Sequence, residues 1–141
     1  MKKGGNISVK NLTIKYGDKV AINDVSIELI EGKVTAFIGP SGCGKSTFLR
    51  AFNRMNDEII GASMEGDISW MGKQILSDEI DPVLLRRAVS MVFQKPNVFP
   101  ISIYENVAFG LRIQGENEPS NLDAAVKQSL VDAALWDEVK D

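Results

Sequence analysis

The sequence of 141 residues contains no histidine and a single cysteine, Cys43. The lack of histidine excludes imidazole acid–base catalysis and histidine metal ligands, and one thiol cannot form a disulfide within the chain. No apolar run approaches the ~18 residues that a membrane-spanning helix needs, so we expect no direct insertion into a membrane. Lys2 and Lys3 are followed by Gly4 and Gly5 rather than by the apolar stretch of a signal peptide. We therefore expect a cytoplasmic protein.

A strong excess of one charge is also absent, since 16 basic residues face 19 acidic ones and the net charge is −3. Proteins that bind nucleic acids usually carry a basic stripe, so we expect no nucleic-acid partner. The apolar fraction of 44% is ordinary for a soluble globular chain, and the length suits one domain with a sizeable core. Function must therefore be inferred from motifs rather than from composition.

The most informative segment has the pattern G-x-x-x-x-G-K-S of a phosphate-binding loop (P-loop). Its residues are Gly39, Pro40, Ser41, Gly42, Cys43, Gly44, Lys45, Ser46 and Thr47. Glycines let successive backbone N–H groups point inward and hold an anion. Lys45 can reach the outer phosphates of a nucleotide, and the Ser46 hydroxyl can bind the Mg²⁺ that bridges them. We predict that the whole loop binds nucleotide and that Ser46 is a metal ligand.

The residues around the loop have the order that this motif requires, which is strand, loop and helix. Residues 34–38 form an apolar run with β-branched side chains, typical of a buried parallel strand. Residues 47–52 contain no glycine or proline and place Phe48 and Phe52 at helical spacing. A second apolar run, residues 88–93, predicts another buried strand.

The first 29 residues predict antiparallel strands, because apolar and polar residues alternate from Ile7 to Leu29. The alternation changes phase at Asn11, which predicts a bulge or a corner between two strand pieces, and it changes phase again at residues 23–24. Gly17 and the aspartate after it predict the turn between two strands. Two further short strands are predicted at 67–70 and 73–76, on either side of a glycine.

The remaining segments predict helices. Asp81 and Pro82 are an N-cap and first helical residue, and residues 102–105 are a capping box. After a polar linker at 114–120, apolar residues recur at helical spacing from Leu122 to Ala133, with a cap within 120–123. We therefore expect an α/β fold class, with antiparallel N-terminal strands, part of a P-loop nucleoside triphosphatase core, and helices that follow it.

Four segments together resemble the nucleotide-binding subunits of ABC transporters. Tyr16 precedes the P-loop at the distance where that family places an aromatic ring to stack on adenine. Residues 91–94 match the strand that ends in the family's Q-loop glutamine, here Gln94, and residues 102–111 resemble the start of its helical subdomain. The resemblance implies ATP and Mg²⁺ as cofactors, Tyr16 as an adenine platform, and Gln94 as a contact to Mg²⁺ and the attacking water.

Within the family, residues 52–57 and 94–100 look most similar to the ATPase subunits of bacterial phosphate importers. The implied domain is divided into a β subdomain with the first core strand at about 6–38, a core from P-loop to Q-loop at 39–100, and a helical subdomain that begins at 101–141. The implied partners are a second ATP-binding subunit and membrane-spanning permease subunits. These partners would hold the protein at the cytoplasmic face of the membrane.

Three elements of the family are absent from the 141 residues: the Leu-Ser-Gly-Gly-Gln signature, the second acidic motif with its catalytic glutamate, and the switch histidine. We therefore expect a truncated chain that binds Mg-ATP weakly and hydrolyses it very slowly. The loop at 96–100 is expected to dock a membrane-spanning partner. Cys43 lies inside the P-loop, so we expect nucleotide to protect its thiol from alkylation.

Three alternatives remain open. The chain could serve another ABC importer, because the subunit does not touch the transported solute. It could be a small P-loop kinase or GTPase, although no lid arginines or base-reading motif can be identified. It could also be a fragment without catalytic function that acts only in folding or interaction.

Overall fold

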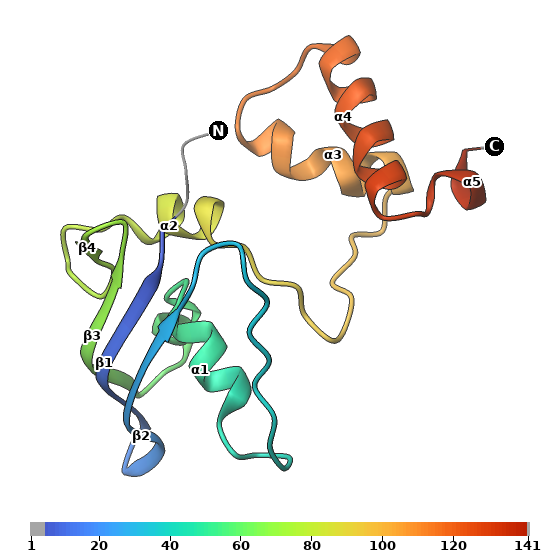
Figure 1. The fold of residues 1–141 in the computed structure, drawn as a ribbon. Helices are drawn as coiled ribbons and strands as arrows, with labels where there is room; N and C mark the ends of the chain where they lie inside the picture. Colours follow the sequence, from blue (N-terminus) through green and yellow to red (C-terminus); the bar gives the residue numbers. More distant parts are fainter. Residues whose placement is uncertain (1–4, 141) are drawn as a thin grey trace. The chain divides into compact units, whose positions relative to one another are not determined.

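The structure is a computed structural model that describes residues 5–140. The chain divides into two compact units, with the boundary between Val92 and Phe93. Figure 1 shows a mixed β and helical first unit and a helical second unit. Each unit is described by itself below.

The first unit is built on an antiparallel sheet. Its strands are β1 (Ile7–Tyr16), β2 (Lys19–Leu29), β3 (Ala62–Trp70) and β4 (Lys73–Gln74), in the order β2-β1-β3-β4. All three neighbouring pairs run antiparallel. The predicted antiparallel strands and the turn at Gly17 are confirmed, whereas β3 begins earlier and β4 ends earlier than the sequence indicated.

Both changes of phase in the sequence coincide with bulges in the sheet. The pairing of β1 shifts between Val9 and Leu12, and that of β2 shifts across Asp24. Asn11 and Asp24 have φ of 48° and 50°, and the Asn11 amide donates to the Asp24 carboxylate at 2.9 Å. Because each bulge adds one residue, Val9, Leu12 and Ile14 all face the core and are almost fully buried.

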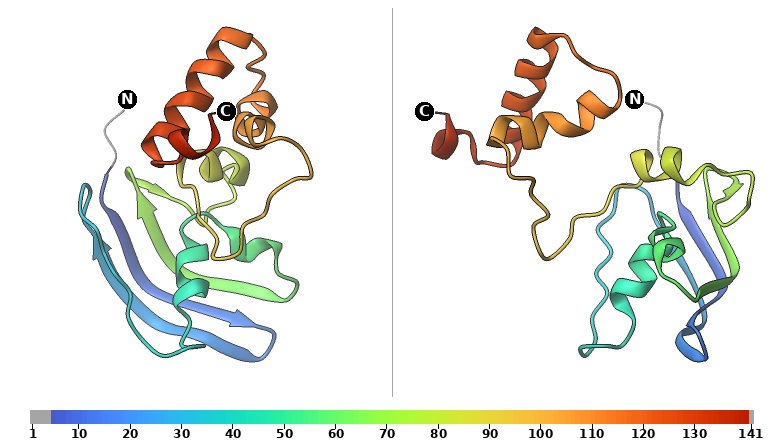
Figure 2. Two further views of the ribbon diagram at one scale, coloured as in Figure 1. Left: turned by 90° about the vertical axis from the view of Figure 1, so that its right-hand side faces the viewer. Right: turned by 180° about the vertical axis from the view of Figure 1, so that it is seen from behind.

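Three short helices accompany this sheet: α1 (Lys45–Ala51), the 3₁₀ helix η1 (Met55–Glu58) and α2 (Pro82–Ala88). Figures 1 and 2 show α1 against one face of the curved sheet. The core there joins sheet residues to Phe48 and Ala51 of α1, to Phe52 just after α1, and to Leu85 of α2. The Asp81 carboxylate accepts a hydrogen bond from the N–H of Val83 at 2.8 Å, which confirms the predicted cap of α2.

The predicted strand at 34–38 does not form. Val34 is 100% exposed and Ile38 is 94% exposed, whereas Phe37 packs on the core beside Phe48. A buried parallel strand needs a neighbour to satisfy its backbone. Within residues 5–140, all paired strands belong to the antiparallel sheet β1 to β4, so this segment has no parallel partner.

The predicted strand at 88–93 is also wrong for this structure. Ala88 is the last residue of α2, and the residues that follow it lack strand pairing. Val92 is 97% exposed, although Val89 packs against the core. The physical reason is the same as for the earlier segment, because no parallel neighbour lies within the described residues.

The second unit contains α3 (Ile103–Ile113), α4 (Pro119–Asp132) and α5 (Trp136–Val139). Ser102 caps α3 by accepting from the N–H of Glu105 at 3.1 Å, as the capping-box pattern predicted. Ala108 of α3 packs against α4 through a small core completed by Leu122, Val126 and Leu130. None of the helices in residues 5–140 is long and apolar enough to cross a membrane.

Two predictions about α4 are wrong. The helix begins at Pro119 with Glu118 as its N-cap, rather than with a cap within residues 120–123. It ends at Asp132, and Ala133 is exposed rather than part of the buried face. Proline is favoured at the first helical position because its fixed φ suits the helix and its missing N–H is not needed there, and this moves the start of α4 earlier.

A hydrogen bond between α3 and α4 changes the pKa of a tyrosine. The Tyr104 hydroxyl donates to the Asp123 carboxylate at 2.6 Å. This hydrogen bond, which ionisation of Tyr104 would break, raises the pKa of Tyr104 above its ordinary value.

Candidate functional site

The glycines of the P-loop adopt backbone conformations that other residues rarely reach. Gly42 has φ of 77° and Gly44 has φ of 97°. A Cβ on Gly44 would lie 2.7 Å from Ile22 Cδ1 and 2.8 Å from the Ala21 carbonyl oxygen. Glycine at 44 is therefore needed both for the left-handed backbone and for close packing against β2. The end of the loop is thereby held against the sheet.

Helix α1 begins at the end of this loop. Gly44 is its N-cap, and its carbonyl accepts the first helical hydrogen bond from Phe48 N–H at 2.8 Å. The start of α1 has no acidic residue in its first turn. The positive end of the helix dipole thus faces the loop without a neighbouring carboxylate in that turn, which suits an anion.

Lys45 folds back over the loop that precedes it. Its ammonium donates to the carbonyl oxygens of Gly39 at 2.8 Å and Pro40 at 2.7 Å, and lies 3.5 Å from the Cys43 sulfur. These acceptors are neutral, and an ammonium is attracted more strongly by an anionic phosphate oxygen, because opposite charges add a Coulomb attraction that a neutral carbonyl lacks. A phosphate oxygen in the loop can therefore replace the carbonyls as partners of Lys45.

Ser46 follows Lys45 in the first turn of α1 and is exposed. Within the part of the chain that the structure describes, its hydroxyl has no hydrogen-bond partner in the protein. Hydroxyl oxygen is a ligand type that Mg²⁺ accepts, usually together with phosphate oxygens and water. The same described residues contain no group of three or more histidine, cysteine or acidic side chains that could hold a metal by themselves.

Tyr16 lies half-buried at the end of β1. Its hydroxyl donates to Asn56 Oδ1 at 2.8 Å and lies 3.3 Å from the hydroxyl oxygen of Thr47, the third residue of α1. The structure thus joins the predicted adenine platform to the helix that carries the P-loop. Asn56 is not part of the P-loop motif, and its place in the segment 52–57, which resembles the ATPases of phosphate importers, is the sequence signal that could have identified it.

Gln94 belongs to the second unit, in an exposed bend just after Phe93. Its predicted contact with Mg²⁺ and water stays a prediction. The adjoining loop is ordered by Asn106 of α3, whose side chain bonds both the N–H and the carbonyl oxygen of Phe99. The Phe99 ring stacks at a tilt on Phe109, with 4.5 Å between ring centres, yet Phe99 keeps 45% exposure.

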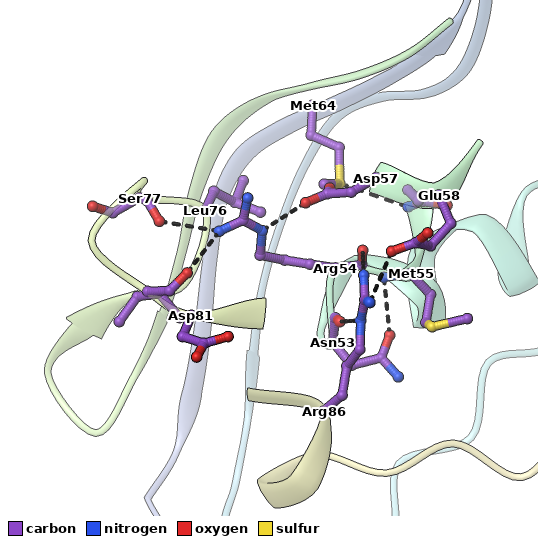
Figure 3. A network of polar contacts seen from close by, with 12 residues as sticks. Asn53, Arg54, Met55, Asp57, Glu58, Met64, Leu76, Ser77, Asp81 and Arg86 are labelled. Carbon is purple, nitrogen blue, oxygen red and sulfur yellow. Dashed lines mark hydrogen bonds and ion pairs between the residues drawn. The ribbon is translucent and has the colours of Figure 1, made fainter. Parts of the chain in front are cut away.

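A polar network supports the segment that follows α1 (Figure 3). Arg54 has φ of 57°, and its guanidinium bonds the Asp57 carboxylate at 2.8 Å and the carbonyl oxygens of Ser77 and Ile80. The Arg54 side chain is only 15% exposed, so these partners satisfy a nearly buried charge. The network joins η1 to the loop before α2.

Arg86 of α2 completes this network from the other side. It donates to the carbonyl oxygens of Asn53 at 3.2 Å and Arg54 at 2.9 Å, and it pairs with Glu58 at 2.8 Å (Figure 3). Arg86 therefore fixes α2 to the carboxyl end of the helix that begins at the P-loop.

A glycine-dependent loop at a helix start, with a lysine drawn across it, has the sequence and local geometry of the P-loop class of proteins. The chain belongs to the ABC transporter family, whose model matches residues 22–140. Membership of this family implies that the domain binds ATP.

Within this family, the chain is similar to curated proteins named for phosphate import. Phosphate import ATP-binding protein PstB 1 of Vibrio parahaemolyticus is 55% identical over 135 residues, which cover 96% of this chain and 50% of that protein. PstB 2 of Bacillus licheniformis is 56% identical over 135 residues, covering 96% of this chain and 49% of that protein. The chain spans about half the length of the curated relatives it matches.

Proposed function

We propose that this chain is the ATP-binding, energy-coupling part of an ABC-type phosphate importer. The observation that carries the proposal is the P-loop itself, in which Gly42 and Gly44 create the curve and Lys45 reaches across it. The relatives named for phosphate import support the choice of transported solute. The membership of the ABC family supports ATP as the bound nucleotide.

The roles of the loop residues follow from their positions. Backbone N–H groups between Ser41 and Thr47 would hold the phosphates, and Lys45 would exchange the carbonyls of Gly39 and Pro40 for phosphate oxygens. Ser46 would contribute its exposed hydroxyl to Mg²⁺, which neutralises the charge of the outer phosphates when bound.

Two residues outside the loop would complete the nucleotide site. Tyr16 would stack on adenine, since its hydroxyl ties its ring to Thr47 of α1 through Asn56. Gln94 would contact Mg²⁺ and the attacking water, a role supported only by its resemblance to the Q-loop residue.

The partners would be a second ATP-binding subunit and the membrane-spanning permease subunits. Residues 5–140 contain no helix able to span a membrane, so attachment to the cytoplasmic face would depend on the permease. The exposed Phe99, held in its loop by Asn106, is the proposed docking residue for that contact.

The first test is calorimetric titration of Mg-ATP into the chain and into Lys45→Ala. We expect about one site per chain, and we expect Lys45→Ala to weaken binding about 10- to 100-fold, because charge-assisted hydrogen bonds are lost. Lys33→Ala is the matched control, since Lys33 is exposed and lies just before the loop. It removes the same charge without removing a P-loop contact.

Equal affinity of the wild type and Lys45→Ala would contradict the proposed phosphate site. Absence of binding by a folded wild type would contradict ATP binding by this chain. In either case, circular dichroism spectra and unfolding midpoints of the three proteins must match, so that a folding defect is not mistaken for a binding defect.

A further inference from the structure

Asn56 is a fully buried polar residue that the P-loop motif does not explain. It lies in η1, and its side chain has 0% exposure. A buried amide that lacks hydrogen bonds is costly, so its partners determine where it can sit. These partners connect two parts of the proposed nucleotide site.

The orientation of the Asn56 amide is fixed by a backbone carbonyl. Asn56 Nδ2 donates to the carbonyl oxygen of Thr47 at 2.9 Å. Because a carbonyl oxygen can only accept, the amide nitrogen must face Thr47 and Oδ1 must face the opposite side. Oδ1 there accepts from the Tyr16 hydroxyl at 2.8 Å, which fixes the direction of the tyrosine proton as well.

The result is a chain of contacts from the end of β1 to the first turn of α1. Tyr16 is the last residue of β1, so its backbone is held by the sheet, where it pairs with Lys19 and Ala62. Its hydroxyl end is held by Asn56 and lies 3.3 Å from the Thr47 hydroxyl oxygen. With both ends fixed, the ring has one orientation relative to the P-loop.

We propose that Asn56 is a positioning residue, which holds the Tyr16 ring in place for the base of a bound purine nucleotide. This inference rests on the proposed function, and it adds a residue that acts through Tyr16 rather than by touching ATP. Stacking on an aromatic ring strengthens base binding only where the ring face is presented to the base. Loss of Asn56 should therefore weaken binding of the base and leave phosphate binding in place.

The experiment compares two probes, Mg-ATP and Mg-tripolyphosphate, by calorimetry on the full 141-residue chain. The dissociation constant of Mg-tripolyphosphate divided by that of Mg-ATP measures how much the nucleoside adds to phosphate binding. This ratio falls when binding of the base is weakened. We expect Tyr16→Ala to lower this ratio about 5- to 100-fold, the range found for base stacking. We expect Asn56→Leu and Tyr16→Phe each to lower it about 3- to 10-fold, with no further loss when they are combined.

If Asn56 acts through Tyr16, the double variant should lose no more than either single variant. A merely structural role of Asn56 would instead add its own loss to that of Tyr16→Phe. Asn53→Leu is the matched control, because Asn53 is also a buried asparagine at 4% exposure but bonds the N–H of Met55 rather than Tyr16. We expect it to leave the ratio unchanged. If Asn56→Leu does not fold, Tyr16→Phe tests the same hydrogen bond, since it removes only the hydroxyl oxygen.

A ratio that stays at the wild-type value in folded Asn56→Leu and in Tyr16→Phe would overturn the inference. A ratio unaffected by Tyr16→Ala would overturn it too, since the base would not use that ring. Both results leave tripolyphosphate binding and its dependence on Lys45 intact. Failure of the proposed function is different: wild type would then bind neither probe, or Lys45→Ala would bind both as well as wild type.

Discussion

Cys43 allows the P-loop to be followed chemically, because it is the single cysteine of the chain. Its thiol is exposed and lies 3.5 Å from the Lys45 ammonium, inside the proposed phosphate site. We predict that saturating Mg-ATP slows its alkylation by iodoacetamide at least about 10-fold, since little protein remains unliganded at such concentrations. Mass spectrometry of timed samples measures the rate directly.

The control for this prediction is Lys45→Ala, in which the same concentration of Mg-ATP should protect much less. Equal rates with and without nucleotide in the wild type would show that bound nucleotide does not cover residue 43. The calorimetric titration measures the affinity for Mg-ATP, whereas the alkylation rate shows whether the bound nucleotide covers Cys43.

At the residue scale, the sequence predicted those features whose chemistry is local. The P-loop could be found because its glycines, Lys45 and Ser46 lie within one short segment. Asn56 lies outside this segment, and its proposed role depends on Tyr16, 40 positions away in the sequence. Residues that act across such distances become visible only when the fold brings them together.

At the scale of elements, Gly66 of β3 lies against the bulge of β1, so its substitution tests how closely the two strands must approach there. Gly66 has φ of 106°, and a Cβ there would lie 2.5 Å from the carbonyl oxygen of Asn11, the bulged residue. We predict that Gly66→Ala lowers the free energy of unfolding by about 1–3 kcal/mol through backbone strain alone, and further through this clash. Urea unfolding followed by Trp70 fluorescence, in a Trp136→Phe background, measures the first unit.

Gly72→Ala is the matched control, because Gly72 also has a positive φ, 75°, but a Cβ there would meet no atom within 4 Å. It should cost only the backbone strain. If the two substitutions cost the same free energy, Gly66 is not needed for the close approach of β3 to the bulge.

The predicted elements succeeded or failed according to where their stabilising contacts lie. The strands within 7–29 pair with one another, so their alternation correctly predicted antiparallel strands, and its changes of phase fall where the structure has bulges. The segments 34–38 and 88–93 have the composition of buried strands, but composition cannot supply a pairing partner. Val34 and Val92 are accordingly exposed in the structure.

For the whole molecule, binding and hydrolysis of ATP have different requirements. Binding needs the P-loop, Mg²⁺ and a base platform, for which Lys45, Ser46 and Tyr16 are the proposed residues. Hydrolysis also needs a group that orients or deprotonates the attacking water. The chain has no histidine, and it lacks the acidic motif in which the resembling family carries its catalytic glutamate.

We therefore predict that this chain binds Mg-ATP but hydrolyses it at or below about 10⁻³ s⁻¹, the scale of a P-loop protein without its full catalytic set. Phosphate release over several hours measures the rate, and Lys45→Ala prepared identically gives the background from contaminating enzymes. Turnover near 10 s⁻¹, a typical enzyme rate, that is lost in Lys45→Ala would contradict the prediction. A group within these 141 residues, with Gln94 the first candidate, would then have to activate the water.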